Sequence, residues 1–308
     1  MNGYILAVDT GGSKTQLSLF DLSGNQLSNA RCKGIGVSYG AEAPLEVLSG
    51  TLNGLMTEKA FSEVRSIVIN VGGANTEEIR KAFAFFFPSA QIRVFRESSG
   101  VIMSELCEIA GADAILMAGT GTIALAKGKN GNIITDGWCP NVGDWGSGYH
   151  IGLEAISRSV KALETDVALP PLAKYITGRN MPFKAVSNTE EQMILRDEVR
   201  SHFMPLERAD VAKLTQDAAR YAREGDEMAI NIFVDAGKAL AQTTLRGIKL
   251  ADCNENARVL VSGGLTKCVD LWGPSFEKTL QSENKKYSWF VGYADMIKGA
   301  LHYALKTL

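Results

Sequence analysis

The segment at residues 9–15 combines residue types that suit a phosphorylated ligand. It reads Asp-Thr-Gly-Gly-Ser-Lys-Thr and follows an apolar run at residues 4–8. Glycines let backbone N–H groups approach an anion, hydroxyls and a lysine add donors, and Asp9 is suited to orient water on a magnesium ion. It is not a Walker A loop, because Gly and Lys are not adjacent and a β-type run follows. We expect a nucleotide phosphate and its magnesium here, with a plain hairpin as the alternative. The expected nucleotide-binding residues are Asp9, Thr10, Gly11, Gly12, Ser13, Lys14 and Thr15, with Asp9 at the metal.

A second glycine-rich segment, Gly-Thr-Gly-Thr at residues 119–122, follows an apolar run at residues 114–117. With the next two residues it has the Gly-x-Gly-x-x-Ala spacing of a Rossmann loop, which requires a helix to follow. Residues 123–127 and the Asn-Gly-Asn turn behind them instead predict a strand and a hairpin. We therefore favour a second phosphate loop over a dinucleotide site. Its expected nucleotide-binding residues are Gly119, Thr120, Gly121 and Thr122.

Two further motifs place glycines at the boundaries of expected elements. Residues 143–148 read Gly-Asp-Trp-Gly-Ser-Gly directly before a helical stretch. Asp144 is there either a helix cap or a carboxylate that holds a hydroxylated ligand. Three glycines in six positions exceed what a cap requires, so we favour the ligand. At residues 262–264 a Ser-Gly-Gly turn lets the backbone pass close to a flat ligand, although close helix–strand packing explains Gly263 and Gly264 equally well.

The apolar pattern predicts that a β-rich unit occurs twice. Strands are expected at residues 4–8, 16–20, 26–31, 66–71, 92–95, 114–117, 123–127, 133–135 and 258–261. Helices are expected at residues 44–59, 76–87, 101–110, 151–163, 211–223, 226–250 and 296–305. The succession of strand, Gly-rich turn, strand and Gly-Asn turn restarts near residue 114, which indicates an internal repeat, with two unrelated hairpins as the alternative. Residues 165–208 have weak periodicity and are expected to form a mobile insertion.

Length and composition narrow the class of protein. A chain of 308 residues with 45% hydrophobic and 21% charged residues is globular and long enough for two domains. Thirty-two Lys and Arg balance 34 Asp and Glu, which argues against a dedicated nucleic-acid binder. Apolar runs are too short to span a bilayer and the start lacks signal-peptide features, so a cytoplasmic location is expected. The five cysteines are expected to be plain thiols, with a bridging cluster at a dimer interface as the alternative.

In this order the motifs resemble those of the sugar kinase/actin/Hsp70 superfamily, and more closely those of the BadF/BadG/BcrA/BcrD ATPase family, which includes N-acetylglucosamine kinases. Residues 5–20 are similar to the first phosphate motif, 114–126 to the second and 259–265 to the adenosine motif. Residues 137–152 are the most specific match to the kinase branch. The resemblance implies an α/β fold of two ribonuclease-H-like (actin-like ATPase) domains flanking a nucleotide cleft. It also implies ATP and Mg²⁺ as cofactors and phosphoryl transfer to a sugar hydroxyl.

The resemblance further implies domain boundaries and site residues. The N-terminal domain would be residues 1–110 plus 294–308, and the C-terminal domain, with a helical insertion, residues 111–293. Glu97 stands where the branch has the Asp of Asp-Ala-Ala-Gly, and it is implied as the base toward the sugar hydroxyl; a surface Glu97 paired with Arg93 or Arg96 is the alternative. The implied catalytic residues are Glu97 and Asp144. The implied acceptor-binding residues are Ser38, Gly72, Gly73, Glu97, Thr120, Trp138, Asp144 and Gly148, while Gly263 and Gly264 would flank adenosine.

Besides Glu97, three further positions depart from the pattern of the branch. Trp145 replaces the Glu of Gly-Asp-Glu-Gly-Ser, and Ser38 and Val71 stand where N-acetylglucosamine kinases tend to have Asn and Ser. The ATP side is kept and the acceptor side is altered. We expect an ATP-dependent kinase for an amino sugar or related hexose, forming a homodimer that binds neither nucleic acid nor membrane. The alternatives are an ATP-driven activator of a partner enzyme and a nucleotide-binding regulator without turnover.

Overall fold

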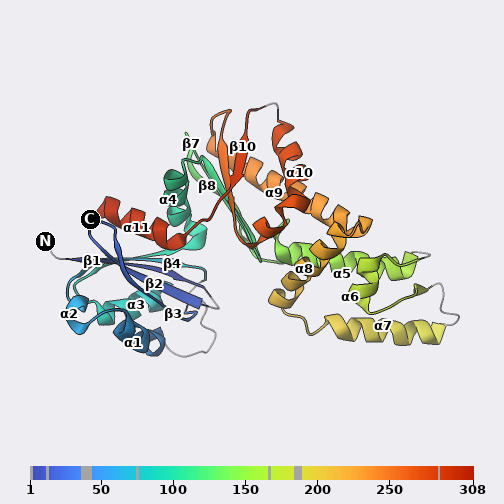
Figure 1. The fold of residues 1–308 in the computed structure, drawn as a ribbon, viewed down its shortest axis with the longest axis horizontal. Coiled ribbons are helices and arrows are strands. Elements are labelled where there is room, and N and C mark those ends of the chain that lie inside the picture. Colours follow the sequence, from blue (N-terminus) through green and yellow to red (C-terminus); the bar gives the residue numbers. More distant parts are fainter. Residues whose placement is uncertain are drawn as a thin grey trace. The chain divides into compact units, whose positions relative to one another are not determined.

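The computed structural model describes residues 3–11, 14–35, 44–73, 76–165, 168–183, 189–283 and 285–308. The chain folds as two compact units, the first made of Met1–Asp113 and Ala294–Leu308 and the second of Ala114–Tyr293 (Figure 1). Each unit contains one five-stranded sheet flanked by helices, so the fold is of the α/β class. Within the described residues, no helix is both long enough and apolar enough to cross a membrane.

The sheet of the first unit has the order β3-β2-β1-β4-β5. Its strands are β1 (Tyr4–Thr10), β2 (Lys14–Asp21), β3 (Gln26–Lys33), β4 (Val64–Val71) and β5 (Gln91–Arg96). The first three form an antiparallel meander, and β4 and β5 continue the sheet in parallel with β1. The carboxyl ends of β1, β4 and β5 therefore meet at one edge of the sheet.

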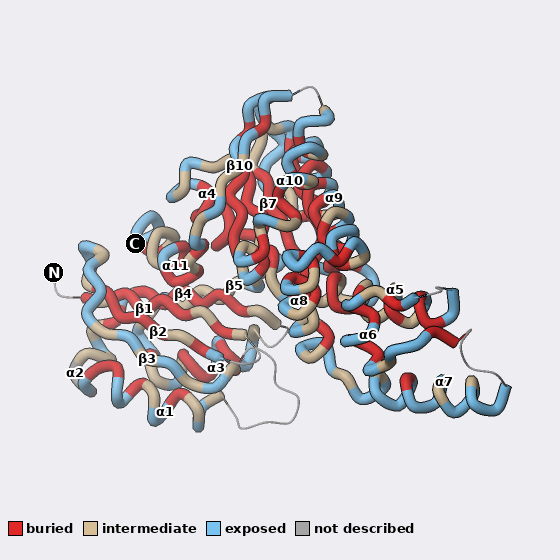
Figure 2. The backbone as a smooth tube through the Cα atoms, turned by 45° about the vertical axis from the view of Figure 1, so that its right-hand side comes forward, coloured by how far each residue is buried: buried red, intermediate tan, exposed pale blue. Residues whose placement is uncertain are grey.

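Helices cover both faces of this sheet. One face carries α1 (Pro44–Leu55), α2 (Glu58–Phe61) and α3 (Thr76–Phe86), and the other carries α4 (Val101–Ala110) and α11 (Met296–Thr307) (Figure 1). Burial from both sides explains the near-continuous apolar run of β4, which Figure 2 shows as largely buried. Leu48 and Phe83, from the helices of one face, join Val8 of β1 in the core.

The sheet of the second unit has the order β10-β9-β6-β7-β8. Its strands are β6 (Ala114–Ala118), β7 (Thr122–Gly128), β8 (Gly131–Asp136), β9 (Arg258–Ser262) and β10 (Ser288–Val291). Again the first three are an antiparallel meander and the last two run parallel to the first. Because β6, β7, β8, β9 and β10 reproduce the order and direction of β1 to β5, the predicted internal repeat is confirmed.

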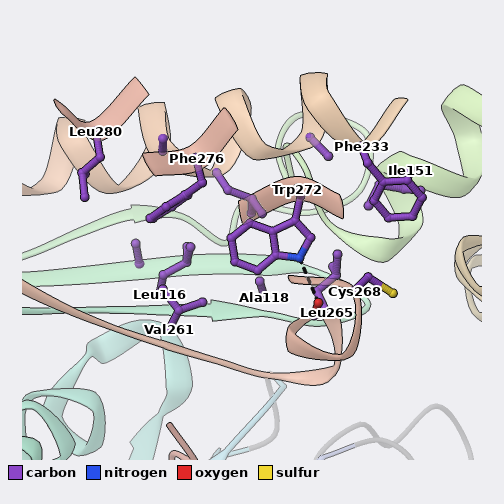
Figure 3. Close-up of a cluster of buried hydrophobic side chains, with 14 of the residues drawn as sticks. Leu116, Ala118, Ile151, Phe233, Val261, Leu265, Cys268, Trp272, Phe276 and Leu280 are labelled. Carbon is purple, nitrogen blue, oxygen red and sulfur yellow. Dashed lines mark hydrogen bonds between the residues drawn. The ribbon is translucent and has the colours of Figure 1, made fainter. Parts of the chain in front are cut away.

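The helices of the second unit form its core together with the sheet. They are α5 (Gly148–Thr165), α6 (Pro171–Thr177), α7 (Thr189–Phe203), α8 (Arg208–Arg223), α9 (Glu227–Ala251) and α10 (Val269–Gln281), with a 3₁₀ turn η3 (Gly264–Cys268) before α10. Trp272 of α10 is fully buried beside Phe276, and its indole Nε1 donates to the Leu265 carbonyl at 2.9 Å (Figure 3). This bond fixes η3, the turn that follows the Gly-Gly motif.

Most expected elements are present, with ends shifted by a few residues. The helix expected at residues 44–59 is divided into α1 and α2, and residues 165–208, expected as an insertion of weak periodicity, contain α6 and α7. In α7 only Val199 is buried, so no apolar stripe marks it in the sequence (Figure 2). The sequence reasoning also missed α10, which contains Gly273 and Pro274, and the four-residue strand β10.

Gly152 of α5 lies directly against Val211 of α8, with no space for a side chain between the two helices. A Cβ at this position would lie 1.9 Å from the Val211 carbonyl oxygen. Gly152→Ala should therefore push the helices apart and lower the free energy of unfolding by roughly 1–3 kcal/mol, measured by denaturant unfolding. Gly50→Ala in α1, where a Cβ would meet no described atom within 4 Å, should instead stabilise by roughly 0.5–1 kcal/mol. Equal effects of the two substitutions would contradict this packing.

Candidate active site

In the first unit, polar side chains gather where β1, β4 and β5 end. Asp9, one residue before the end of β1, is in register with Asn70 of β4. The Asn70 amide Nδ2 donates to Asp9 Oδ1 at 2.8 Å, which orients the carboxylate. Just beyond β4, the Gly72 N–H donates to the Thr10 carbonyl at 2.8 Å and keeps the two strand ends together. The parallel pairing thus brings the first phosphate motif and the Gly72 segment to one place.

Glu97 begins the short 3₁₀ turn η1 (Glu97–Ser99) directly after β5. Its carboxylate lies against Gly72, where an added Cβ would be 3.4 Å from Glu97 Oε2. Burial raises the pKa of Glu97, and the negative charge of Asp9 raises it further. A salt bridge to Arg93 or Arg96 would have the opposite effect on this pKa. Neither arginine is among the causes of this shift, so the alternative of a surface ion pair gains no support.

The Asp9 carboxylate experiences opposing influences. Burial raises its pKa most strongly, the hydrogen bond from Asn70 and the charge of Lys14 lower it, and the charge of Asp295 raises it, for a net increase. Asp295 caps α11, accepting from the Ile297 N–H at 3.0 Å. The sequence reasoning missed Asn70 and Asp295, because only the fold brings β4 and the start of α11 beside β1.

The β1–β2 hairpin is closed by its own backbone and hydroxyls. The Gly11 N–H donates to the Lys14 carbonyl at 3.0 Å. The Thr10 and Thr15 hydroxyls are buried, lie 2.7 Å apart and both accept from the Ile35 N–H at 3.3 Å. These two hydroxyls therefore hold the base of the hairpin together, while the Lys14 side chain is exposed. Gly12 and Ser13 lie outside the described residues, as does Ser38.

In the second unit, the β6–β7 turn is bound to the start of α5. The Gly119 N–H donates to the Gly121 carbonyl at 2.9 Å and closes the turn. From α5, the Gly148 N–H donates to the Gly119 carbonyl at 2.8 Å, and the Tyr149 N–H donates to the Thr120 carbonyl at 3.1 Å. Thr120 is exposed and Thr122 is buried. The predicted second phosphate loop and Gly148 are thus brought together.

The Asp144 side chain is hydrogen-bonded to this turn. Its carboxylate is buried; Oδ1 accepts from the Thr122 N–H at 2.8 Å, and Oδ2 accepts from Arg208 Nη2 at 2.6 Å. Asp144 is in the left-handed region, with φ +60°. The helix-cap alternative does not describe it, because the hydroxyl of Ser147 accepts from the His150 N–H in the first turn of α5. Both carboxylate oxygens are bonded within the chain, and the sequence reasoning missed Arg208.

Asp136, at the end of β8, is a second carboxylate that the sequence reasoning missed. It accepts from the N–H groups of Gly137 at 2.9 Å, Asp144 at 2.7 Å and Trp145 at 3.1 Å. Burial nevertheless raises its pKa, and these bonds only partly oppose the effect. A Cβ at Gly143 would lie 2.5 Å from Asp136 Oδ1, so the glycine is needed for this loop to close. The Asp-Gly pair at the end of an expected strand was the signal in the sequence that could have identified Asp136.

The tryptophans of the same loop differ in their surroundings. Trp138 is 75% exposed. Trp145, which stands where the kinase branch has Glu, is 40% exposed and lies under the guanidinium of Arg246, 5.2 Å from the ring centre. This cation–π contact joins the loop to α9. Trp138 is therefore open to contact a ligand, whereas Trp145 already has a partner within its own unit.

The Gly-Gly motif after β9 contains two different glycines. Gly263 has φ +105°, and a Cβ there would lie 2.3 Å from the Ala118 carbonyl, so close packing requires it. Gly264 has no such requirement, since no described atom lies within 4 Å of the position of its Cβ. Its backbone N–H is 3.9 Å from the position of a Cβ at Gly119, which places the two motifs side by side.

These features fit ATP and a magnesium ion. At Gly11, as at Gly264, an added Cβ would meet no described atom within 4 Å, so packing against the described residues does not require a glycine there and the backbone is accessible. No group of three or more His, Cys, Asp or Glu residues that could hold a metal occurs among the described residues. Magnesium bound with a nucleotide usually takes one or two carboxylates, phosphate oxygens and water, so Asp9 is sufficient as a donor.

Two sheets of the same strand order, each with a glycine turn between its first two strands, define an actin-like ATPase fold. The sequence model of the BadF/BadG/BcrA/BcrD ATPase family matches residues 6–301, and the chain belongs to this family. The resemblance seen in the motifs is thereby confirmed over nearly the whole chain.

Individual relatives are only distantly similar to this chain in sequence. An N-acetylmuramic acid/N-acetylglucosamine kinase of Clostridium acetobutylicum is 27% identical over 175 residues, which span 52% of this chain and 55% of that protein. The match thus covers about half the length of this curated relative. A Chromobacterium violaceum protein proposed to be an N-acetylglucosamine kinase has a TM-score of 0.68 at 20% identity, over 97% of this chain and 98% of that one. A Streptomyces griseus ROK-family glucokinase, solved with glucose and AMPPNP, has a TM-score of 0.57 at 14% identity, over 99% and 100% of the two chains.

The raised pKa of Glu97 predicts how the stability of the folded protein depends on pH. A carboxyl whose pKa is higher in the folded than in the unfolded protein binds its proton more tightly when folded, so stability falls as pH rises above the ordinary value of 4.5. Glu97→Gln should therefore melt at a higher temperature than the wild type at pH 8, and the difference should vanish as pH falls toward 4.5.

Glu77→Gln is the matched control, because Arg80 lowers the pKa of the exposed Glu77. This substitution should leave the melting temperature unchanged or slightly lower at pH 8. Melting curves recorded between pH 4.5 and pH 8 measure both effects. A Glu97→Gln protein that is less stable than the wild type at pH 8 would contradict the proposed surroundings of this carboxylate.

Proposed function

We propose that this chain is an ATP-dependent kinase that phosphorylates a hydroxyl of an amino sugar or related hexose. The observation that carries the proposal is the Glu97 carboxylate, which lies against Gly72 beside Asp9, at the strand edge where the first phosphate motif ends. The kinase names of the relatives and the family membership support it. The two alternatives, an activator of a partner enzyme and a regulator without turnover, gain no specific support from the described residues.

Two glycine turns of the chain would each contact the nucleotide. The backbone at Gly11 and the exposed Lys14 would contact its phosphates from the β1–β2 hairpin, and the segment 119–122 would do so from the β6–β7 turn. Gly263 and Gly264 would pass along the adenosine. Asp9, oriented by Asn70, would hold water on the magnesium ion. Bound ATP supplies the phosphoryl group, and the chain supplies position and charge.

Glu97 would take the proton of the attacking sugar hydroxyl at its carboxylate. Its raised pKa suits this task, because a general base is most effective when its pKa lies near the working pH. Only the ionised form can accept the proton, so turnover should increase as pH rises through this pKa. Glu is one methylene longer than the Asp of the branch, and the acceptor must sit correspondingly further from the backbone.

The residues implied for acceptor binding differ in whether they are exposed or already bonded within the chain. Trp138 and Thr120 are exposed, and we propose both as contacts for the sugar, with Gly72, Gly73 and Gly148 as backbone contacts. We assign Asp144 a positioning role, because both of its oxygens are bonded to Thr122 and Arg208. Ser38, the homodimer, the cytoplasmic location and the domain boundaries at residues 110/111 and 293/294 stay predictions.

An ATP-consumption assay across hexoses and N-acetylhexosamines tests the function. The wild type should phosphorylate at least one sugar, with the product identified by mass spectrometry. Glu97→Gln should lower kcat about 100-fold or more, because an amide cannot accept the hydroxyl proton, and should leave the affinity for ATP nearly unchanged. Glu97→Asp should change the relative rates among sugars.

Glu77→Gln, on the exposed surface of α3, is the control and should keep the wild-type kcat. The absence of a phosphorylated product from every sugar, in a protein that binds ATP, would overturn the kinase proposal. Full kcat in Glu97→Gln with the native sugar would overturn the role of this carboxylate as base.

A further inference from the structure

Arg208, the first residue of α8, reaches the second phosphate loop from a distant part of the sequence. Its Nη2 donates to Asp144 Oδ2 at 2.6 Å, although the two residues are 64 positions apart. The Asp144 side chain is 5% exposed, whereas the Arg208 side chain is 45% exposed. The pair therefore has a buried acidic end and a basic end that is open to solvent.

The guanidinium lies directly against the β6–β7 turn. A Cβ added to Gly121 would be 2.6 Å from Arg208 Nη2 and 2.6 Å from Asp144 Oδ1. No side chain larger than hydrogen fits at Gly121 while this pair is in place. The glycine of the second phosphate motif thus makes room for an arginine that the motif itself does not contain.

The chemistry of this turn lacks a cation of its own. Residues 119–122 are Gly, Thr, Gly and Thr, so they offer a phosphate only backbone N–H groups and hydroxyls. Arg208 adds a permanent positive charge with five N–H donors in a planar fork, the geometry that suits phosphate oxygens. Asp144 is the hydrogen-bond partner of this fork among the described residues, and it engages one nitrogen. The other donors remain for a ligand.

We propose that Arg208 binds the phosphate chain of the nucleotide at the β6–β7 turn and that Asp144 holds its guanidinium in place. The inference rests on the proposed binding of ATP, and it does not depend on which acceptor is used. A fixed positive charge at this turn would also stabilise the negative charge on the oxygens of the transferred phosphoryl group. Because the guanidinium is already paired, little ordering is required when the nucleotide binds.

Calorimetric titration of the full chain with magnesium AMPPNP and with adenosine tests the proposal. In Arg208→Gln the affinity for AMPPNP should fall about 10- to 100-fold, as expected for the loss of charge-assisted hydrogen bonds. The affinity for adenosine, which has no phosphate, should change less than about twofold by the same reasoning. Arg208→Lys should lie between the wild type and Arg208→Gln, because it keeps the charge without the fork.

Two further variants separate this role from a purely structural one. Arg158→Gln removes an arginine that pairs with Glu154 and Asp235 on the same unit, and it should leave both affinities unchanged. The double variant Asp144→Asn/Arg208→Gln removes both charges, so no buried carboxylate is left unpaired. It should retain the selective loss of AMPPNP binding.

The outcomes distinguish this inference from the proposed function. Equal weakening of AMPPNP and adenosine in Arg208→Gln, or no weakening of either, would overturn the role of Arg208. A wild type that binds AMPPNP but phosphorylates no sugar would overturn the kinase proposal alone, and the comparison of variants would still decide the role of Arg208. A wild type that does not bind AMPPNP would overturn both.

Discussion

The candidate site of the second unit depends on the hydrogen bonds that the buried carboxylate of Asp144 accepts. The carboxylate joins the loop after β8, in which Asp144 lies, to the β6–β7 turn through Thr122 and to α8 through Arg208. The backbone N–H of Asp144 also donates to Asp136 at the end of β8. A buried carboxylate needs such partners, because a buried charge without hydrogen-bond partners is destabilising. The glycines at positions 121 and 143 follow from this arrangement, because each leaves space for a carboxylate oxygen.

The first unit repeats the strand order but uses its carboxylates differently. Burial raises the pKa of both Asp9 and Glu97; the charge of Asp295 adds to the increase at Asp9, and the charge of Asp9 adds to the increase at Glu97. Such an arrangement lowers stability and is typical of sites that bind cations or move protons. The two units thus have similar turns with different charged groups beside them. Asp9 and Glu97 lie near the first turn, and the Arg208–Asp144 pair lies at the second.

Local pattern was sufficient for the parts of the site that lie on strand ends. Apolar runs placed β1 and β6, and the glycine turns followed them. Glu97 was identified by the resemblance to the kinase branch, in which an Asp stands at this position. The sequence could not reveal Arg208, since three helices, α5, α6 and α7, separate it from Asp144 along the chain and only the packing of α5 against α8 brings it to the turn. Asn70 was hidden for a similar reason, because its role depends on the register of β4 with β1.

We propose that the segment around Gly11 and the segment 119–122 each contact nucleotide phosphates. Hydrogen–deuterium exchange during titration with magnesium AMPPNP tests it most directly, because backbone amides that contact phosphate exchange more slowly. The account predicts that peptides containing Gly11 and peptides containing residues 119–122 become protected together, with the same midpoint in AMPPNP concentration. Protection of one turn without the other, at saturating nucleotide, would contradict it.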